Sequence, residues 1–94
     1  MYFTYMSDIK KANRDAGMYW FQRFSDVKID RSLYDCIEGS TYTGCLFISS
    51  ERGPDNVRRW TVRKANTDGS IVTASEPGQF STSNEARRWA MLTS

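Results

Sequence analysis

A chain of 94 residues, of which 39% are hydrophobic, 14% aromatic and 26% charged, predicts one globular domain with its own core and excludes a disordered protein. The formal charge of +2 is too small to establish nucleic-acid binding by itself, and it excludes a DNA mimic, whose surface must be strongly negative. The chain has no histidine and only two cysteines, which excludes Ser-His-Asp triads, Cys-His pairs, histidine-bearing zinc sites and four-thiolate zinc sites.

The N-terminus predicts neither secretion nor membrane insertion. The opening MYFTYM has no basic residue before it and no cleavage site of small residues behind it. No stretch approaches the roughly 20 apolar residues that span a bilayer. We therefore expect a cytoplasmic protein with reduced thiols and a single domain over residues 1–94, in which Met1 to Tyr5 are an N-terminal extension if Met6 is the natural start.

A first helix is predicted between Ser7 and Gly17. Ser7 can cap free backbone N–H groups, Asp8 favours the positive end of the helix dipole, and Gly17 favours termination. The spacing assigns an inner face to Ile9, Ala12, Asn13 and Ala16, and an outer face to Lys10, Lys11, Arg14 and Asp15.

An aromatic cluster follows this helix without a clear period: Tyr19, Trp20, Phe21 and Phe24. We expect these side chains to belong to the core and to anchor the helix on a sheet, because aromatic residues bury large apolar areas. An exposed aromatic binding patch is the alternative. The next segment, from Ser25 to Ser32, fits either a short strand or an irregular loop.

A strong strand is predicted from Cys45 to Ser50, and because both of its faces are largely apolar we expect it to be central in the sheet. A hairpin centred on Ser40 and Thr41 would place Cys36 opposite Cys45. Two reduced core thiols are favoured over a disulfide there, since the protein is expected in the cytoplasm.

A second strand is predicted from Val57 to Ala65, after a turn over residues 51–56. Alternation directs Trp60 and Val62 to the core and leaves Arg59 and Arg63 outside, beside Thr61. The Asn66-Thr67-Asp68-Gly69 sequence predicts a hairpin turn with Gly69 in the left-handed conformation, followed by a strand from Ser70 to Ser75.

The last helix is predicted to begin at Thr82, after a break at Pro77, because Thr82 and Glu85 match a capping box. Its inner stripe is expected to contain Ala86, Trp89, Ala90 and Leu92, and its solvent face Arg87 and Arg88. The predicted fold is therefore α+β, a three- to four-stranded antiparallel sheet flanked by an N-terminal and a C-terminal helix.

Several of these signals together resemble small uncharacterised proteins common in bacteriophages and other mobile elements. The residues that carry the resemblance are Ala12-Asn13 through Gly17, Trp20-Phe21, Phe24-Ser25, Phe47, Ser49-Ser50-Glu51, Arg59-Trp60-Thr61-Val62-Arg63, Asp68-Gly69, Ile71, Thr73, Phe80, Thr82, Glu85 and Ala86. They are turn and core signals. The resemblance implies no activity, only a setting: an accessory phage or prophage gene expressed in a bacterial cell.

The sharpest predicted surface feature is a set of cations that we call the basic row, formed by Arg59, Arg63, Arg87 and Arg88 with Arg58 and Lys64 close by. Arginines arranged in this way could hold phosphates or an acidic protein surface through bidentate hydrogen bonds. An ordinary solvated face, balanced by nearby carboxylates, is the alternative reading. Lys10, Lys11 and Arg14 on the first helix are interpreted as groups that aid solubility.

Enzyme and double-stranded RNA classes are disfavoured. The helix-strands-helix order is shared with double-stranded RNA binding domains, but Glu85 stands near the start of the last helix, where it would repel phosphate. Acidic pairs such as Glu51 and Asp55 lie beside turn residues, and no pattern proposes a nucleophile, a base and an orienting group together.

The leading functional hypothesis is a non-enzymatic protein that inhibits a host defence complex, such as a CRISPR effector, by covering a protein surface. Arg, Tyr and Trp are frequent here, and these residues favour interface hot spots. The alternative is a nucleic-acid-binding or regulatory protein that uses the basic row. No cofactor or metal is expected, and the sequence leaves monomer and homodimer open.

Overall fold

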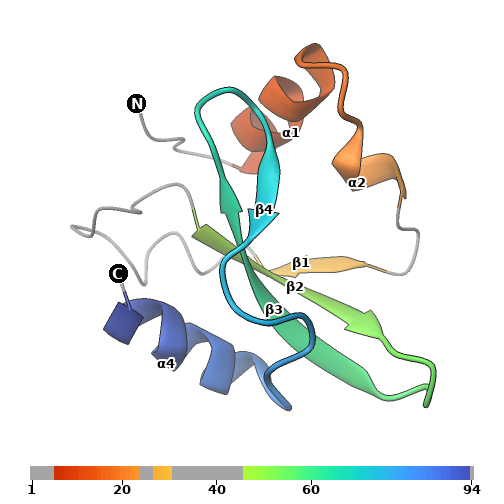
Figure 1. Ribbon diagram of the computed structural model, residues 1–94, viewed down its shortest axis with the longest axis vertical. Helices are drawn as coiled ribbons and strands as arrows, with labels where there is room; N and C mark the ends of the chain where they lie inside the picture. The colour runs from red at the N-terminus through yellow and green to blue at the C-terminus, as the bar shows by residue number, and fades with distance from the viewer. Residues whose placement is uncertain (1–5, 24–26, 31–45, 94) are drawn as a thin grey trace.

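The computed structural model describes residues 6–23, 27–30 and 46–93 (Figure 1). In chain order these residues form α1 (Met6–Asp15), α2 (Trp20–Arg23), β1 (Lys28–Asp30), β2 (Leu46–Arg52), β3 (Arg58–Ala65), β4 (Ile71–Thr73) and α4 (Ser83–Thr93). The strands make one antiparallel sheet in the order β1-β2-β3-β4. The predicted α+β class is therefore confirmed, with a four-stranded sheet.

The first helix begins at Met6, one residue before the predicted cap, so Ser7 lies in its first turn. Its end is as predicted: Gly17 has φ 76°, its N–H donates to the Arg14 carbonyl, and the Met18 N–H donates to the Asn13 carbonyl over 3.1 Å. This pair of hydrogen bonds is the Schellman arrangement that a glycine after the last helical turn permits.

The central position predicted for the strand after residue 44 is also confirmed. β2 pairs with β1 on one side and with β3 on the other, and residues 46–50 are all buried. The register places Ile48 opposite Val62 and Phe47 opposite Arg63. Because side chains alternate across a strand, Ile48 and Val62 share one face of the sheet, while Phe47 and Arg63 share the other.

Each face of the β2–β3 pair has its own cover. Trp20 and Phe21 pack on Phe47, with ring centroids 5.9 Å and 5.8 Å away from it. Helix α4 contacts β2 and β3 and buries Ala86 and Ala90 completely. Figure 1 shows α1 and α2 at one end of the molecule, beside the β3–β4 hairpin, and α4 at the other.

One buried polar side chain joins three elements at the first of these ends. Asn13 of α1 is 1% exposed; its Oδ1 accepts the Trp20 N–H over 2.7 Å and its Nδ2 donates to the Gly69 carbonyl over 2.8 Å. Gly69 has φ 94°, as the hairpin prediction requires, and a Cβ there would lie 2.4 Å from the Ala12 carbonyl oxygen. Asn13 and Gly69 therefore fix the docking of α1 on the β3–β4 turn.

The predicted cap of the last helix is present as well. The Glu85 N–H donates to Thr82 Oγ1 over 3.2 Å, immediately before α4. Phe80 precedes it as a short bridge to β3, in which the Trp60 N–H donates to the Phe80 carbonyl over 2.9 Å. The α4 helix is thereby held against the sheet at its start.

Some sequence expectations were wrong about burial. Leu92, expected on the inner stripe of the last helix, is 80% exposed, because it falls off the Ala86–Ala90 stripe at the end of α4. Ala16 is exposed since α1 has already ended at Asp15. Tyr19, expected in the core, is 48% exposed.

Other expectations fall outside the described residues: the Met1 to Tyr5 extension, Phe24, the Ser40–Thr41 hairpin and the Cys36–Cys45 juxtaposition. The segment from Ser25 to Ser32 contains the short strand β1, which decides between the two readings left open for it. No helix in the described part of the chain is long and apolar enough to cross a membrane.

Candidate functional site

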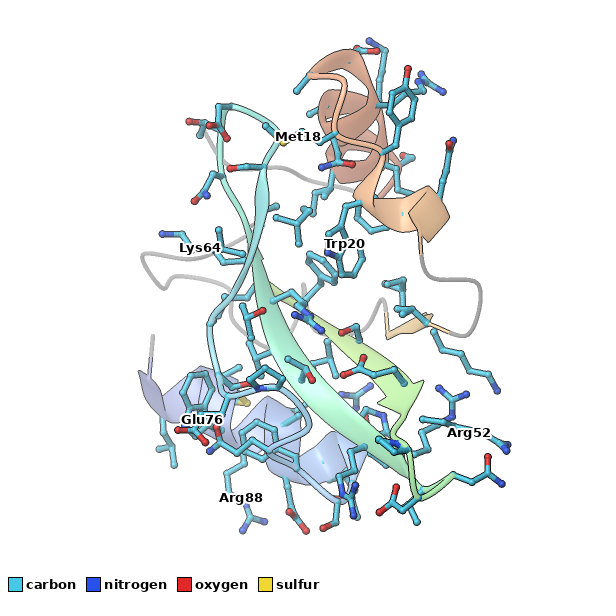
Figure 2. All side chains as sticks on the ribbon, turned by 45° about the vertical axis from the view of Figure 1, so that its right-hand side comes forward. Met18, Trp20, Arg52, Lys64, Glu76 and Arg88 are labelled. Carbon is cyan, nitrogen blue, oxygen red and sulfur yellow. The ribbon has the colours of Figure 1, made fainter. Side chains whose placement is uncertain are left out.

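The basic row does not form one surface. Alternation along β3 places Arg58 and Lys64 on the face of Val62, and Arg59 and Arg63 on the face of Phe47. Figure 2 shows Arg88 at the α4 end of the molecule, away from Trp20, whose ring Arg63 contacts. The predicted addition of Arg87 and Arg88 to the side of Arg63 is therefore wrong.

Arg63 itself lies inside the fold, contrary to the expectation that it faces solvent. Its side chain is 15% exposed, and its guanidinium carbon lies 5.6 Å from the centroid of the Trp20 ring. The guanidinium donates to Ser49 Oγ over 3.1 Å and to Thr73 Oγ1, and it lies 3.6 Å from Glu51 Oε1. Arg63 lies in β3 on the Phe47 face of the sheet. Its side chain therefore joins β3 to α2, β2 and β4.

The electrostatics of Arg63 follow from this position. Burial lowers the pKa of the Arg63 guanidinium below its ordinary value, and the nearby Glu51 carboxylate acts in the opposite sense. An arginine still keeps its proton in such surroundings, so the group is a buried cation whose charge Glu51 offsets. Its 15% exposure and its hydrogen bonds to Ser49 and Thr73 leave little of it open to a phosphate from solution.

The neighbouring polar groups form one hydrogen-bonded chain. Thr61 Oγ1 donates to Glu51 Oε1 over 2.8 Å and accepts the Gly78 N–H over 2.8 Å. Ser49 Oγ lies 3.4 Å from Glu51 Oε2. Thr61 was expected outside but is fully buried, because the segment that contains Gly78 folds over this face of β3.

Arg59 is the arginine of this face that reaches solvent. It forms an ion pair with Asp55 across the β2–β3 turn, with Nη2 and Oδ2 2.8 Å apart and the two side chains 42% and 48% exposed. The hydrogen bond from Arg59, followed by the one from the Val57 N–H, holds the pKa of Asp55 below its ordinary value. The cation of Arg59 is therefore partly neutralised within its own turn.

A shallow hollow lies beside this ion pair. It has a volume of about 410 Å³ and is lined by Glu51, Gly53, Pro54, Arg59, Pro77 and Gly78. We call it the β2–β3 hollow. Its wall holds one carboxylate and one guanidinium, so the exposed part of the predicted site presents both signs of charge.

The remaining members of the basic row are spread over other parts of the molecule. Arg58 is half-buried and donates from Nη1 to the carbonyl and hydroxyl oxygens of Ser50 over 2.9 Å and 3.0 Å. Lys64 and Arg87 are half-buried and Arg88 is exposed. Of the predicted site residues, Arg59 and Arg63 share the Phe47 face of the sheet, and these two differ in exposure.

The polar chain does not offer chemistry to a substrate. Ser49 and Thr61 are the hydroxyl groups nearest the Glu51 carboxylate, and both are fully buried and engaged in the bonds described above. Among the residues that the structure describes, no three His, Cys, Asp or Glu side chains come close enough to hold a metal ion. The hydrogen bonds of Ser49, Glu51 and Thr61 therefore connect β2, β3 and the segment around Gly78.

A second concave surface was missed by the sequence reasoning. A groove of about 530 Å³ lies between α1 and α2, with Lys10, Lys11, Arg14, Tyr19 and Phe21 in its wall. We call it the α1–α2 groove. The signal available in the sequence was Gly17, which ends the helix and turns Tyr19 back toward the outer face of α1.

Comparison with known proteins gives a family but no described activity. No curated protein and no solved structure matched the chain. The model of a family of unknown function, DUF7447, matches residues 5–91, which is nearly the whole chain. The chain therefore belongs to the DUF7447 family.

Proposed function

We propose that this domain is a non-enzymatic binding protein of mobile-element origin, which acts in the bacterial cytoplasm by covering a surface of a host defence complex, as anti-CRISPR proteins do. The observation that carries the binding role is the pairing of its exposed charges. On the β2–β3 side of the molecule, Arg59 pairs with Asp55 over 2.8 Å. A surface of paired charges suits recognition of another protein surface better than recognition of a polyanion.

The same observation weighs against the nucleic-acid alternative. Binding to a phosphate backbone depends on several cations that release counterions together. Arg63 is buried against Trp20, and Arg59 already has a carboxylate partner, so β3 does not present a continuous row of available cations. The setting in a host defence complex is supported by the resemblance of the sequence to small phage proteins.

Plaque counting tests the proposal in cells. The chain is expressed in bacterial strains whose CRISPR systems target a phage, and the phage is plated beside a derivative that lacks the targeted sequence. We expect the protein to restore plaques of the targeted phage toward the number given by the derivative. An unchanged count in strains that carry different effector types would contradict an anti-CRISPR role.

Biochemical capture then separates the two classes of partner. The tagged protein is bound to a nuclease-treated lysate of a strain that it protects, and co-purification of effector subunits is the expected result. Affinity for DNA or RNA that falls steeply between low and moderate salt would instead support the nucleic-acid alternative. The stoichiometry of the recovered complex also decides between monomer and homodimer.

A further inference from the structure

The α1–α2 groove is a basic surface with an apolar extension. Lys10, Lys11 and Arg14 of α1 form one wall, and Tyr19 and Phe21 form the other. A smaller hollow of about 100 Å³ adjoins it, since Lys10 and Phe21 line both, and adds Val27 and Ile29. A ligand that follows this path would meet cations first and then aliphatic side chains.

The charge of the groove is not balanced by its own side chains. Asp15 is the carboxylate near these cations, 2.8 Å from Lys11 Nζ and 3.8 Å from Arg14 Nε. In the described part of the chain, no carboxylate lies within ion-pair distance of Lys10, whose Nζ instead sits 5.8 Å from the centroid of the Phe21 ring. Lys11 and Arg14 therefore share one carboxylate and Lys10 has none within ion-pair distance, which leaves the groove positive.

The groove is also held in a fixed shape. The buried Asn13 lines it and accepts the Trp20 N–H over 2.7 Å, which holds the start of α2 against α1. Tyr19, the residue just before this bond, has φ 54° and remains 48% exposed. A bulky residue rarely adopts this left-handed conformation, and such strain is common at binding sites. The Tyr19 side chain lines the groove together with Lys10, Lys11 and Arg14.

We propose that the α1–α2 groove binds an acidic segment of a partner protein, in which carboxylates meet Lys10, Lys11 and Arg14 and an aliphatic side chain enters the hollow of Val27 and Ile29. Charge complementarity selects the acidic residues, and the adjoining hollow selects the aliphatic one. A single strand of nucleic acid fits less well because it needs successive open rings for stacking. Tyr19 offers such a ring, whereas Phe21 is covered by Lys10 and packs against Trp20 and Phe47.

This inference rests on the proposed function, since the ligand belongs to a partner protein, but it can be tested without any host complex. The probe is a fluorescein-labelled peptide of alternating glutamate and leucine, titrated with the full chain at low ionic strength and followed by fluorescence anisotropy. A peptide with glutamine in place of glutamate and an oligothymidylate serve as comparison ligands. The plaque assay tests the proposed function and the peptide titration tests the groove, so a failure of one can be distinguished from a failure of the other.

Matched charge reversals locate the site. Lys10→Glu combined with Arg14→Glu is expected to weaken peptide binding about tenfold or more, since exposed ion pairs each contribute a modest share. Arg52→Glu combined with Arg88→Glu reverses the same number of charges at two exposed residues far from Met18 and α1 (Figure 2) and is expected to leave binding unchanged. Circular dichroism checks that each variant is folded.

Binding of the acidic peptide alone, lost in the α1 variant and kept in the Arg52→Glu and Arg88→Glu double variant, supports the proposal. Equal loss in both variants, equal binding of the glutamine peptide, or no binding overturns it. Tighter binding of the oligothymidylate through the same residues also overturns it, because the ligand class would then be nucleic acid. Should the α1 variant not fold, backbone amide shifts of the unmodified protein must change at Lys10, Arg14 and Tyr19 on peptide addition, or the proposal fails.

Discussion

The guanidinium of Arg63 lies over the indole ring of Trp20, with 5.6 Å between the guanidinium carbon and the ring centroid. This contact joins the end of the N-terminal helical region to the centre of β3. It makes Arg63, which most resembled a binding arginine, a largely covered residue that contacts the core, and it leaves Arg59 as the more exposed arginine of the same sheet face.

Arg63→Ala is therefore expected to destabilise the fold much more than Arg59→Ala. Loss of the stacking on Trp20 and of the hydrogen bonds to Ser49 and Thr73 should cost about 2–3 kcal/mol. Arg59→Ala removes an exposed pair and should cost substantially less. Urea unfolding of both variants followed by tryptophan fluorescence measures the difference, and equal midpoints would show that Arg63 is not a structural residue.

Gly17 and Gly69 both have positive φ, so the effects of replacing each with alanine can be compared. Gly17→Ala meets no atom within 4 Å and should cost only the left-handed conformation, about 1 kcal/mol. Gly69→Ala places its Cβ 2.4 Å from the Ala12 carbonyl oxygen, so α1 must move away from the hairpin. The free energy of unfolding should fall by clearly more in Gly69→Ala. Similar losses in the two variants would mean that α1 is not seated on this turn.

Asn13→Ala is expected to cost about 2–4 kcal/mol, because it leaves the Trp20 N–H and the Gly69 carbonyl without the partner that they have now. Asn84→Ala, at an exposed position of α4, is the control and should change stability little. Hydrogen exchange gives an independent readout, since the Trp20 amide should exchange faster in Asn13→Ala. An unchanged exchange rate would contradict the proposed bond.

Those elements whose signals are local could be predicted from the sequence. The Asn66 to Gly69 turn, the Thr82 cap and the Gly17 stop each depend on residues within a few positions, and each is present in the structure. The strand β2 was recognisable as central because both of its faces are apolar. Local chemistry therefore predicted the fold class and the order of α1, the sheet and α4, but not the short helix α2.

The candidate site could not be predicted in the same way, because exposure depends on contacts between distant segments. Alternation correctly separated Arg63 from Val62, but it could not reveal that Trp20 covers the face of Arg63. Likewise, Thr61 is buried by the backbone around Gly78, 17 positions away. A strand pattern shows which side chains share a face; the rest of the fold decides which face meets solvent.

Acidification is expected to destabilise the protein through three exposed aspartates. Hydrogen bonds from Lys11 to Asp15, from Arg59 to Asp55 and from Ser70 to Asp68 lower the pKa of each carboxyl from its ordinary value of 3.8. A carboxyl group whose pKa is lower in the folded state than in the unfolded state stabilises the fold when the pH is above the unfolded-state pKa. This contribution is lost as the pH falls through the folded-state pKa. The melting temperature should therefore be level near neutral pH and fall below about pH 4.

Asp55→Asn provides the control for this acid dependence. Its melting temperature should be lower near neutral pH and should fall less on acidification than that of the unmodified protein. Added salt should reduce the difference between the two, since the Arg59–Asp55 pair is exposed to solvent. Identical pH profiles would show that Asp55 does not contribute to the acid transition.

Substitutions of Tyr19 distinguish most directly between an effect on the free energy of unfolding and an effect on peptide binding. In Tyr19→Gly the left-handed conformation at φ 54° is no longer strained, and this gain offsets the greater flexibility of glycine in the unfolded chain. The free energy of unfolding should therefore stay within about 1 kcal/mol of the original value. Affinity for the acidic peptide should nevertheless fall, because the exposed ring beside Lys10 and Arg14 is lost.

Tyr19→Phe keeps both the aromatic ring and the backbone strain, and retained affinity in that variant would assign the contact to the ring rather than to the hydroxyl. A large loss of stability in Tyr19→Gly would instead make Tyr19 a packing residue, and strain at this position would then have no connection with binding.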